Sequence, residues 1–127
     1  MDAKLYLMVA AIIAILYALG FTLFPAYAVV LYGAPAELHL IFAVRILGSV
    51  LLGLGVITWL ARDFRDWSAV RTVLIGGVVA DVIGAIVTAS GTIQGTVNAS
   101  GWLSTIVDIL LGLWALYCLY AGSRKPA

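Results

Sequence analysis

The chain has 127 residues, of which 65% are hydrophobic and 10% are charged, and its mean hydropathy is +1.16. A soluble domain usually carries about 25% charged residues, and one of this length has too little interior to bury so much apolar surface. The formal net charge of +1 gives no electrostatic reason to expect nucleic-acid binding. With one cysteine, Cys118, and one histidine, His39, a disulfide framework, a Cys-based or multi-histidine metal site and bis-histidine haem within one chain are excluded. We therefore expect a lipid bilayer as the main solvent.

Four apolar segments are long enough to cross a bilayer, at residues 4–24, 38–61, 69–90 and 102–121. A span needs about 20 apolar residues, and it must satisfy its own backbone hydrogen bonds, which favours a helix. The first segment also resembles a secretory signal, because Ala26-Tyr27-Ala28 is similar to a cleavage site. Its apolar run is longer than the roughly 7–15 residues of a signal peptide, so we expect a retained helix. The sequence predicts an all-α membrane protein, with residues 1–127 forming one up-down-up-down bundle of four transmembrane helices.

Apart from Arg45, the positive charges lie at one end of this bundle, at the ends of the spans or in the links. They are Lys4, Arg62, Arg65, Arg71, Arg124 and Lys125. The links at 25–37 and 91–101 contain no Lys or Arg. Positively charged links stay on the cytoplasmic side, so both termini are predicted to be cytoplasmic.

The first external link is too apolar for an ordinary loop. Pro25 is suited to the first position of a helix, and aromatic rings with a polar tip gather at the membrane interface. We expect a short interfacial helix from Pro25 to near Gly33, after which Pro35 starts the second span. The second external link contains Asn98-Ala99-Ser100, a glycosylation-acceptor pattern that we interpret as the N-cap region of the fourth span.

Three charged residues, Arg45, Asp81 and Asp108, lie in the interior of the predicted spans, away from their ends. Asp81 is near the middle of the third, in a row of small residues formed by Gly77, Ala85 and Ala89, beside a second row of Gly76, Ala80, Gly84 and Thr88. At a rise of about 1.5 Å per residue, Arg45 and Asp108 lie about 10 Å below the external ends of their helices and Asp81 about 13 Å. Small residues beside each charge predict contact with other helices rather than with lipid.

These charges form the candidate ligand site. Ser49 shares a helix side with Arg45, and Thr105 shares one with Asp108, while Glu37 and His39 would stand at the external mouth. An Arg between two carboxylates leaves a net negative charge, so either one Asp is protonated or a cation completes the site. A structural ion-pair network and an interface with another subunit are the alternatives. The sequence contains no catalytic motif, indicates no particular cofactor and predicts no metal site.

The inner half of the bundle has no ionisable side chain. We expect it to be closed by aliphatic residues, namely Leu52, Val56, Ile57, Leu74, Ile75, Leu116 and Leu119. A pore or carrier needs a polar route to both sides, so the four helices should form a blind pocket that is open to the outside. Because so small a bundle has few internal contacts, we also expect a homo-oligomer or assembly with other membrane subunits.

The segments Arg45–Ser49, Leu51–Gly55 and Trp59–Asp63, with Asn98–Trp102 before the fourth span, resemble DoxX-like small bacterial four-helix membrane proteins. The resemblance covers nearly the whole chain. It implies four helices and a bacterial or archaeal inner membrane, and it supplies no catalytic residue. From the charged residues in the spans, we expect a non-enzymatic protein that binds a small ligand or cation in an externally open polar pocket formed by Arg45, Asp81 and Asp108. An accessory subunit of a larger membrane complex and a small proton- or cation-coupled transporter are the other hypotheses.

Overall fold

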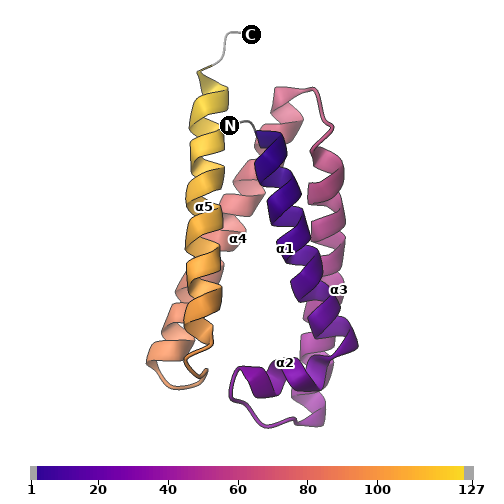
Figure 1. Cartoon of the computed structure of the whole chain (residues 1–127), viewed down its shortest axis with the longest axis vertical. Coiled ribbons are helices and arrows are strands. Elements are labelled where there is room, and N and C mark those ends of the chain that lie inside the picture. Colours follow the sequence, from indigo (N-terminus) through magenta and orange to yellow (C-terminus); the bar gives the residue numbers. More distant parts are fainter. Residues whose placement is uncertain (1–2, 125–127) are drawn as a thin grey trace.

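The computed structural model describes residues 3–124 and contains five helices in that part of the chain. They are α1 (Ala3–Leu23), α2 (Pro25–Leu31), α3 (Leu38–Ala61), α4 (Trp67–Ile93) and α5 (Gly101–Ser123). The four long helices alternate in direction, and α2 lies across the end of the bundle opposite the start of α1 (Figure 1). The predicted all-α fold with four spans is confirmed. The largest difference is in α4, which begins two residues before and ends three residues after the predicted span.

The surfaces of the long helices are strongly apolar. Large side chains such as Phe42, Val87 and Leu113 are 65%, 62% and 60% exposed, and similar residues cover the outer faces of all four helices. All four are long and apolar enough to cross a membrane. Exposed apolar patches of this extent are unfavourable in water and suit a hydrocarbon solvent. The chain is an integral membrane protein.

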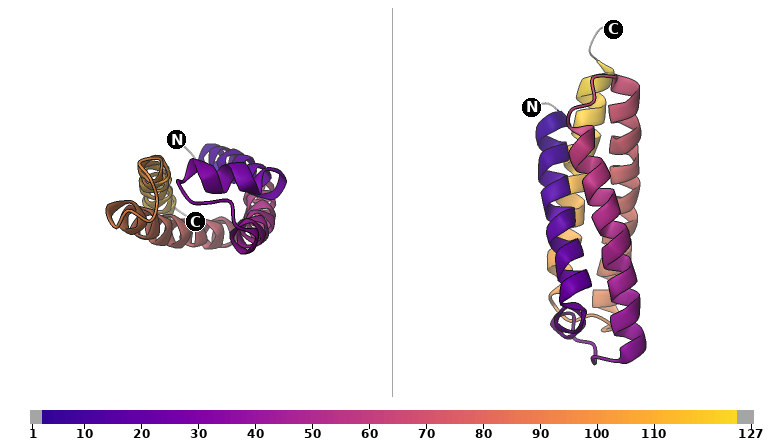
Figure 2. Two further views of the ribbon diagram at one scale, coloured as in Figure 1. Left: turned by 90° about the horizontal axis from the view of Figure 1, so that it is seen from below. Right: turned by 90° about the vertical axis from the view of Figure 1, so that its right-hand side faces the viewer.

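The helices are organised as two antiparallel pairs rather than as four equal neighbours. Helix α1 packs along α3, and α4 packs along α5, while contacts between the pairs are fewer (Figures 1 and 2). In the first pair, two buried glycines of α3, Gly48 and Gly55, lie against α1. A Cβ at Gly48 would come within 2.9 Å of the backbone N of Thr22 and 3.0 Å of the carbonyl O of Ala18. Small residues thus let the two backbones approach closely, as they do in membrane helix pairs generally.

The two pairs meet in a hydrophobic core at the end where α1 begins. This core consists of Tyr6, Leu7, Ala61, Val70, Leu74, Ala115 and Cys118. The ring of Tyr6 packs edge-on against Trp114, with 5.6 Å between ring centroids. Aromatic pairs in this geometry stabilise a core beyond their buried area. This end of the bundle is therefore closed by packed side chains.

The residues that close this end are only partly those predicted. Leu74 is in the core, Leu119 packs against it and Leu52 is half-buried. The other four predicted residues, Val56, Ile57, Ile75 and Leu116, are exposed. The helices meet through their glycine and alanine faces, so these large aliphatic side chains lie on the outer surface of the bundle.

Helix α2 begins at Pro25 as predicted and ends at Leu31, two residues before Gly33. Helix α3 begins at Leu38, so the expectation that Pro35 starts this span is wrong. The reason is local: the N–H of Glu37 donates to the carbonyl of Pro35 at 2.8 Å, and Glu37 itself is extended, with φ −85° and ψ 146°. Pro35 therefore belongs to the turn before α3.

Candidate ligand-binding site

The structure brings Asp81 and Asp108 together in the contact between α4 and α5. Each lies against a glycine of the opposite helix. A Cβ added to Gly84 would be 2.7 Å from Oδ2 of Asp108, and one added to Gly112 would be 3.2 Å from the Cβ of Asp81. Because Gly84 is three residues from Asp81 and Gly112 is four from Asp108, the two carboxylates lie about one helical turn apart along this contact. The glycines thus allow two acidic residues to share one close helix contact.

Asp81 is the inner limit of this site. Its Oδ2 is buried and has no hydrogen-bond partner among the described residues. The hydroxyl of Tyr6, part of the hydrophobic core, lies 2.8 Å from where a Cβ of Gly77 would be and interacts electrostatically with Asp81. An unpaired carboxylate oxygen in a buried position is costly when it is charged. Asp81 therefore sits directly on the closed end of the bundle with part of its bonding capacity unused.

The hydroxyl groups of Thr88 and Thr105 join α4 to α5 on the outer side of the carboxylates. Their oxygens are 2.7 Å apart, and each hydroxyl also approaches a carbonyl of its own helix, Gly84 for Thr88 and Gly101 for Thr105. Thr105 was predicted as a ligand residue, and its hydroxyl is already engaged. It positions the two helices.

Two tyrosines from the first half of the chain, Tyr17 and Tyr32, lie near Asp108 and Ser104. Together with Asp81, Thr88 and Thr105, these residues form the polar cluster. The hydroxyl of Tyr32, just after α2, is 2.6 Å from the hydroxyl of Ser104 on α5. Burial raises the pKa of Tyr32, the hydrogen bond with Ser104 lowers it, and nearby Tyr17 and Asp108 raise it. These influences place Tyr17, Tyr32 and Asp108 in one neighbourhood. Sequence reasoning did not include Tyr17, Tyr32 or Ser104 among the candidate site residues. For Tyr17 and Ser104 the available signal was a polar group at a depth similar to that of Asp108.

A strap of hydrogen bonds crosses the external end between α2 and the α4–α5 link. The side chain of Asn98 donates through Nδ2 to the carbonyl of Leu31 at 2.9 Å, and its backbone N–H donates to the carbonyl of Tyr32 at 2.9 Å. Its Oδ1 accepts the N–H of Ser100 at 3.0 Å, directly before α5. Gly33 has φ +88° and lies against Asn98, where a Cβ would be 3.0 Å from that of Asn98. The carboxamide of Asn98 thus organises the start of α5, as interpreted from the sequence, and also ties the two helix pairs together.

Arg45 does not join the aspartates, so the predicted triad is not formed. Its exposed side chain donates through Nε to the carbonyl of Thr22 at 3.2 Å. Within residues 3–124 the ion pairs are Lys4–Asp63 and Arg62–Asp63, both at 3.4 Å. The glycine face of α3 turns toward α1 and leaves Arg45 on its flank. There it bonds a carbonyl in the last turn of α1, where a positive charge is favoured.

The remaining predicted ligand residues also lie apart from the aspartates. Ser49 is exposed and donates to the carbonyl of Ile46 in its own helix at 2.7 Å. Glu37 and His39 are exposed at the start of α3. In the described part of the chain, no hydrogen bond or ion pair joins any of these three residues to Asp81 or Asp108.

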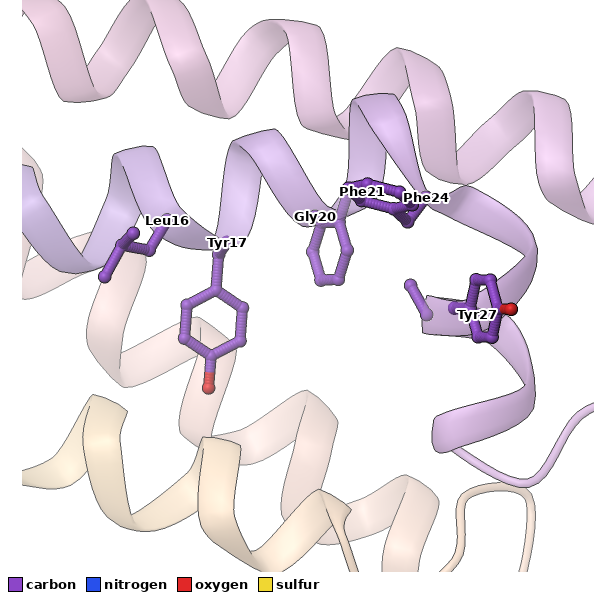
Figure 3. A pocket seen from close by; sticks show the side chains of 7 residues that line it. Leu16, Tyr17, Gly20, Phe21, Phe24 and Tyr27 are labelled. Carbon is purple, nitrogen blue, oxygen red and sulfur yellow. The ribbon is translucent and has the colours of Figure 1, made fainter.

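An apolar pocket that the sequence did not predict lies in the corner between α1 and α2 (Figure 3). Its volume is about 340 Å³, and it is lined by Leu16, Tyr17, Gly20, Phe21, Phe24, Tyr27 and Ala28. The ring of Tyr17 extends from α1 toward the second helix pair (Figure 3). Its position links the pocket to the polar cluster.

The chemistry available here is that of two carboxylates, several hydroxyl groups and aromatic rings. No group of three or more His, Cys, Asp or Glu side chains is gathered within residues 3–124. The aspartates therefore offer a two-carboxylate site, suited to a cation or to a ligand with hydrogen-bond donors. Comparison of the chain with protein-family models, with curated proteins and with solved structures finds no match.

Proposed function

We propose that this integral membrane protein is not an enzyme and that it binds a small cationic ligand, or a cation, at Asp81 and Asp108. The observation that carries the proposal is the pair of neighbouring carboxylates, with Oδ2 of Asp81 buried and unbonded among the described residues. Arg45, the positive group expected to compensate them, bonds to Thr22 instead. A bound positive charge would supply the missing compensation.

The energetic argument follows from the surroundings of the two aspartates. An ionised side chain deep in a membrane helix costs at least about 2.5–3.5 kcal/mol on insertion scales. Two ionised carboxylates side by side also repel each other, so an empty site favours protonation of at least one of them. A cation that displaces this proton gains attraction to both groups. The ring of Tyr17 adds a face that attracts cations.

The proposed setting follows from the charge distribution along the sequence. With both termini in the cytoplasm, Asp81 and Asp108 lie in the outer half of the membrane. The resemblance to DoxX-like proteins supports a bacterial or archaeal inner membrane. The ligand then reaches the site from the outer side, and the hydrophobic core around Tyr6 and Leu74 closes the inner side.

The exposed flank of α3 favours a second function, that of an accessory subunit in a homo-oligomer or a larger membrane complex. Arg45 and Ser49 are polar and exposed on a helix whose other outer residues, such as Phe42 and Ile46, are apolar. Polar side chains at membrane depth often bond across helix interfaces. In this alternative the aspartates only fix the positions of α4 and α5.

Calorimetric titration of the purified protein with sodium and with tetramethylammonium distinguishes the two functions. We expect at least one of these cations to bind, with release of protons, and binding to be lost in Asp81→Asn and Asp108→Asn. Arg45→Gln is the matched control, because it removes a charge from the same depth on another helix, and it should bind within about twofold of the wild type. Failure of both cations to bind, with Asp81→Asn changing only the thermal stability, would support the structural alternative.

A further inference from the structure

The apolar pocket continues the face of α1 that packs against the second helix pair. At the closed end, Tyr6 and Ala10 on this face contact the core that includes Ala115. Residues three or four apart share a helix face, so the same face continues outward to Tyr17 and Gly20. In that outer part Tyr17 and Gly20 line the pocket. The pocket is therefore formed by α1 and α2 alone, and Tyr17 and Gly20 place it on the side of α1 that faces the second helix pair (Figure 3).

The walls of the pocket are mainly aromatic. Tyr17 packs edge-on against Phe21, with centroids 5.8 Å apart, and Phe24 packs in the same way against Tyr27, with centroids 6.5 Å apart. Gly20 contributes open space, because a Cβ there would meet nothing within 4 Å. A pocket of about 340 Å³ with this lining favours an apolar or aromatic body.

The pocket residue Tyr17 and the carboxylate of Asp108 lie at the same depth. Tyr17 is six residues from the outer end of α1 and Asp108 is seven residues from the outer end of α5, which corresponds to about 9 and about 10 Å. Tyr17 lines the pocket, and both Tyr17 and Asp108 act on the hydroxyl of Tyr32. One bound molecule can therefore contact the aromatic walls and lie within electrostatic reach of Asp108.

We propose that the pocket and the aspartates form a single site for a lipophilic organic cation, whose apolar body fills the pocket and whose charge faces Asp108 and Asp81. This inference rests on the proposed function, since it requires that the aspartates bind positive charge. Charge complementarity selects this occupant. An inorganic cation would leave the aromatic pocket without a role, and a neutral lipid chain would leave the carboxylates uncompensated. Aromatic rings beside carboxylates attract organic cations through their negative faces.

The strap defines how such a molecule enters. Asn98 and Tyr32 connect the helix pairs at the external end, above the carboxylates. The pocket lies in the corner between α1 and α2, and its lining residues Leu16, Phe24 and Tyr27 are 63%, 59% and 79% exposed. A lipophilic cation gathers in the outer part of the bilayer, and it can reach the pocket from the side, beneath the strap.

The test compares tetraphenylphosphonium with tetramethylammonium in calorimetric titrations of the protein in nanodiscs. Tetraphenylphosphonium should bind at least tenfold more tightly, and Asp108→Asn should abolish the saturable binding of both. Gly20→Leu fills the pocket and should weaken tetraphenylphosphonium at least tenfold while changing tetramethylammonium by less than about twofold. Gly53→Leu is the matched control, because a Cβ at Gly53 also meets nothing within 4 Å, and Gly53 lies outside the pocket. Ala28→Leu fills the pocket from α2 and replaces Gly20→Leu should that variant not be monodisperse.

Each other outcome overturns the inference in a different way. Tight binding of tetramethylammonium without preference for tetraphenylphosphonium, or with no effect of Gly20→Leu, separates the pocket from the site and leaves the proposed function standing. Tetraphenylphosphonium binding that survives Asp108→Asn assigns the pocket to neutral hydrocarbon, such as a lipid chain. Failure of both cations and of sodium to bind removes the proposed function as well.

Discussion

Asp108 of α5 lies directly against Gly84 of α4, where even a methyl carbon would be 2.7 Å from its Oδ2. The backbone of α4 thus forms one wall of the carboxylate's surroundings. One helical turn farther from the external end, the arrangement is reversed: the aspartate, Asp81, belongs to α4 and the glycine, Gly112, belongs to α5. The contact between α4 and α5 consequently fixes where both carboxylates are presented.

The variant Gly84→Ala should move the Asp108 carboxylate without unfolding the helix pair. The atom that an added methyl would meet first is the far end of a flexible side chain, which can rotate away. We expect binding of tetramethylammonium to fall about tenfold, which corresponds to about 1.4 kcal/mol. Gly76→Ala is the control on the same helix, because a Cβ there meets nothing within 4 Å. Equal affinities in the two variants would mean that Asp108 does not contact the cation.

In the first helix pair, Gly48→Ala should cause a loss of stability. An added Cβ would meet backbone atoms of Thr22 and Ala18, which cannot rotate away, so α1 and α3 must separate. Overpacking of this kind typically costs about 1–3 kcal/mol. Reversible unfolding in detergent measures the effect, with Gly53→Ala on the open face of α3 as control. If Gly48→Ala is no less stable than Gly53→Ala, the backbones of α1 and α3 are not in close contact at Gly48.

Replacing Asn98 by Ala should loosen the external end. The substitution removes the bond to the Leu31 carbonyl and the bond that accepts the Ser100 N–H. Each lost hydrogen bond typically costs about 0.5–1.5 kcal/mol. Spin labels on Tyr27 of α2 and Thr96 of the α4–α5 link should show a broader distance distribution in Asn98→Ala than in the unsubstituted labelled protein. Unchanged distances would show that the strap does not hold the helix pairs together.

Cysteine labelling tests the orientation. In a Cys118→Ala background, Phe64→Cys should react with a membrane-impermeant thiol reagent only from the cytoplasmic side. Gln94→Cys should react only from the outside. Both residues are exposed in links at opposite ends of the bundle. The reverse pattern would place Asp81 and Asp108 in the inner half and contradict the proposed route of entry.

The sequence predicted the spans because length and hydropathy decide them. It also predicted that Asp81 and Asp108 lie at compatible depths on inward faces. In α4, however, the inward face contains Gly77, Asp81, Gly84 and Thr88, whereas Gly76 and Ala80 of the predicted stripe are exposed. Spacing by four residues drifts around a helix of 3.6 residues per turn, so it defines the face only over a short distance.

Two features depend on information that depth and spacing do not contain. Arg45 has the depth of the aspartates, but the rotation of α3 is set by the packing of Gly48 and Gly55 against α1. The pocket exists because the helices associate in two pairs that meet mainly at one end. In the sequence, Tyr17 and Phe21 are indistinguishable from ordinary lipid-facing aromatic residues.

The central claim is that the four helices form a blind site, with Asp81 and Asp108 reached from the outer side and the core around Tyr6 and Leu74 closing the inner side. The most direct measurement is proton and cation flux through the purified protein in liposomes, with protein-free liposomes as the baseline. We predict flux equal to this baseline, in the wild type and in Asp81→Asn alike. Robust wild-type flux that vanishes in Asp81→Asn would contradict the blind site and establish a transport function.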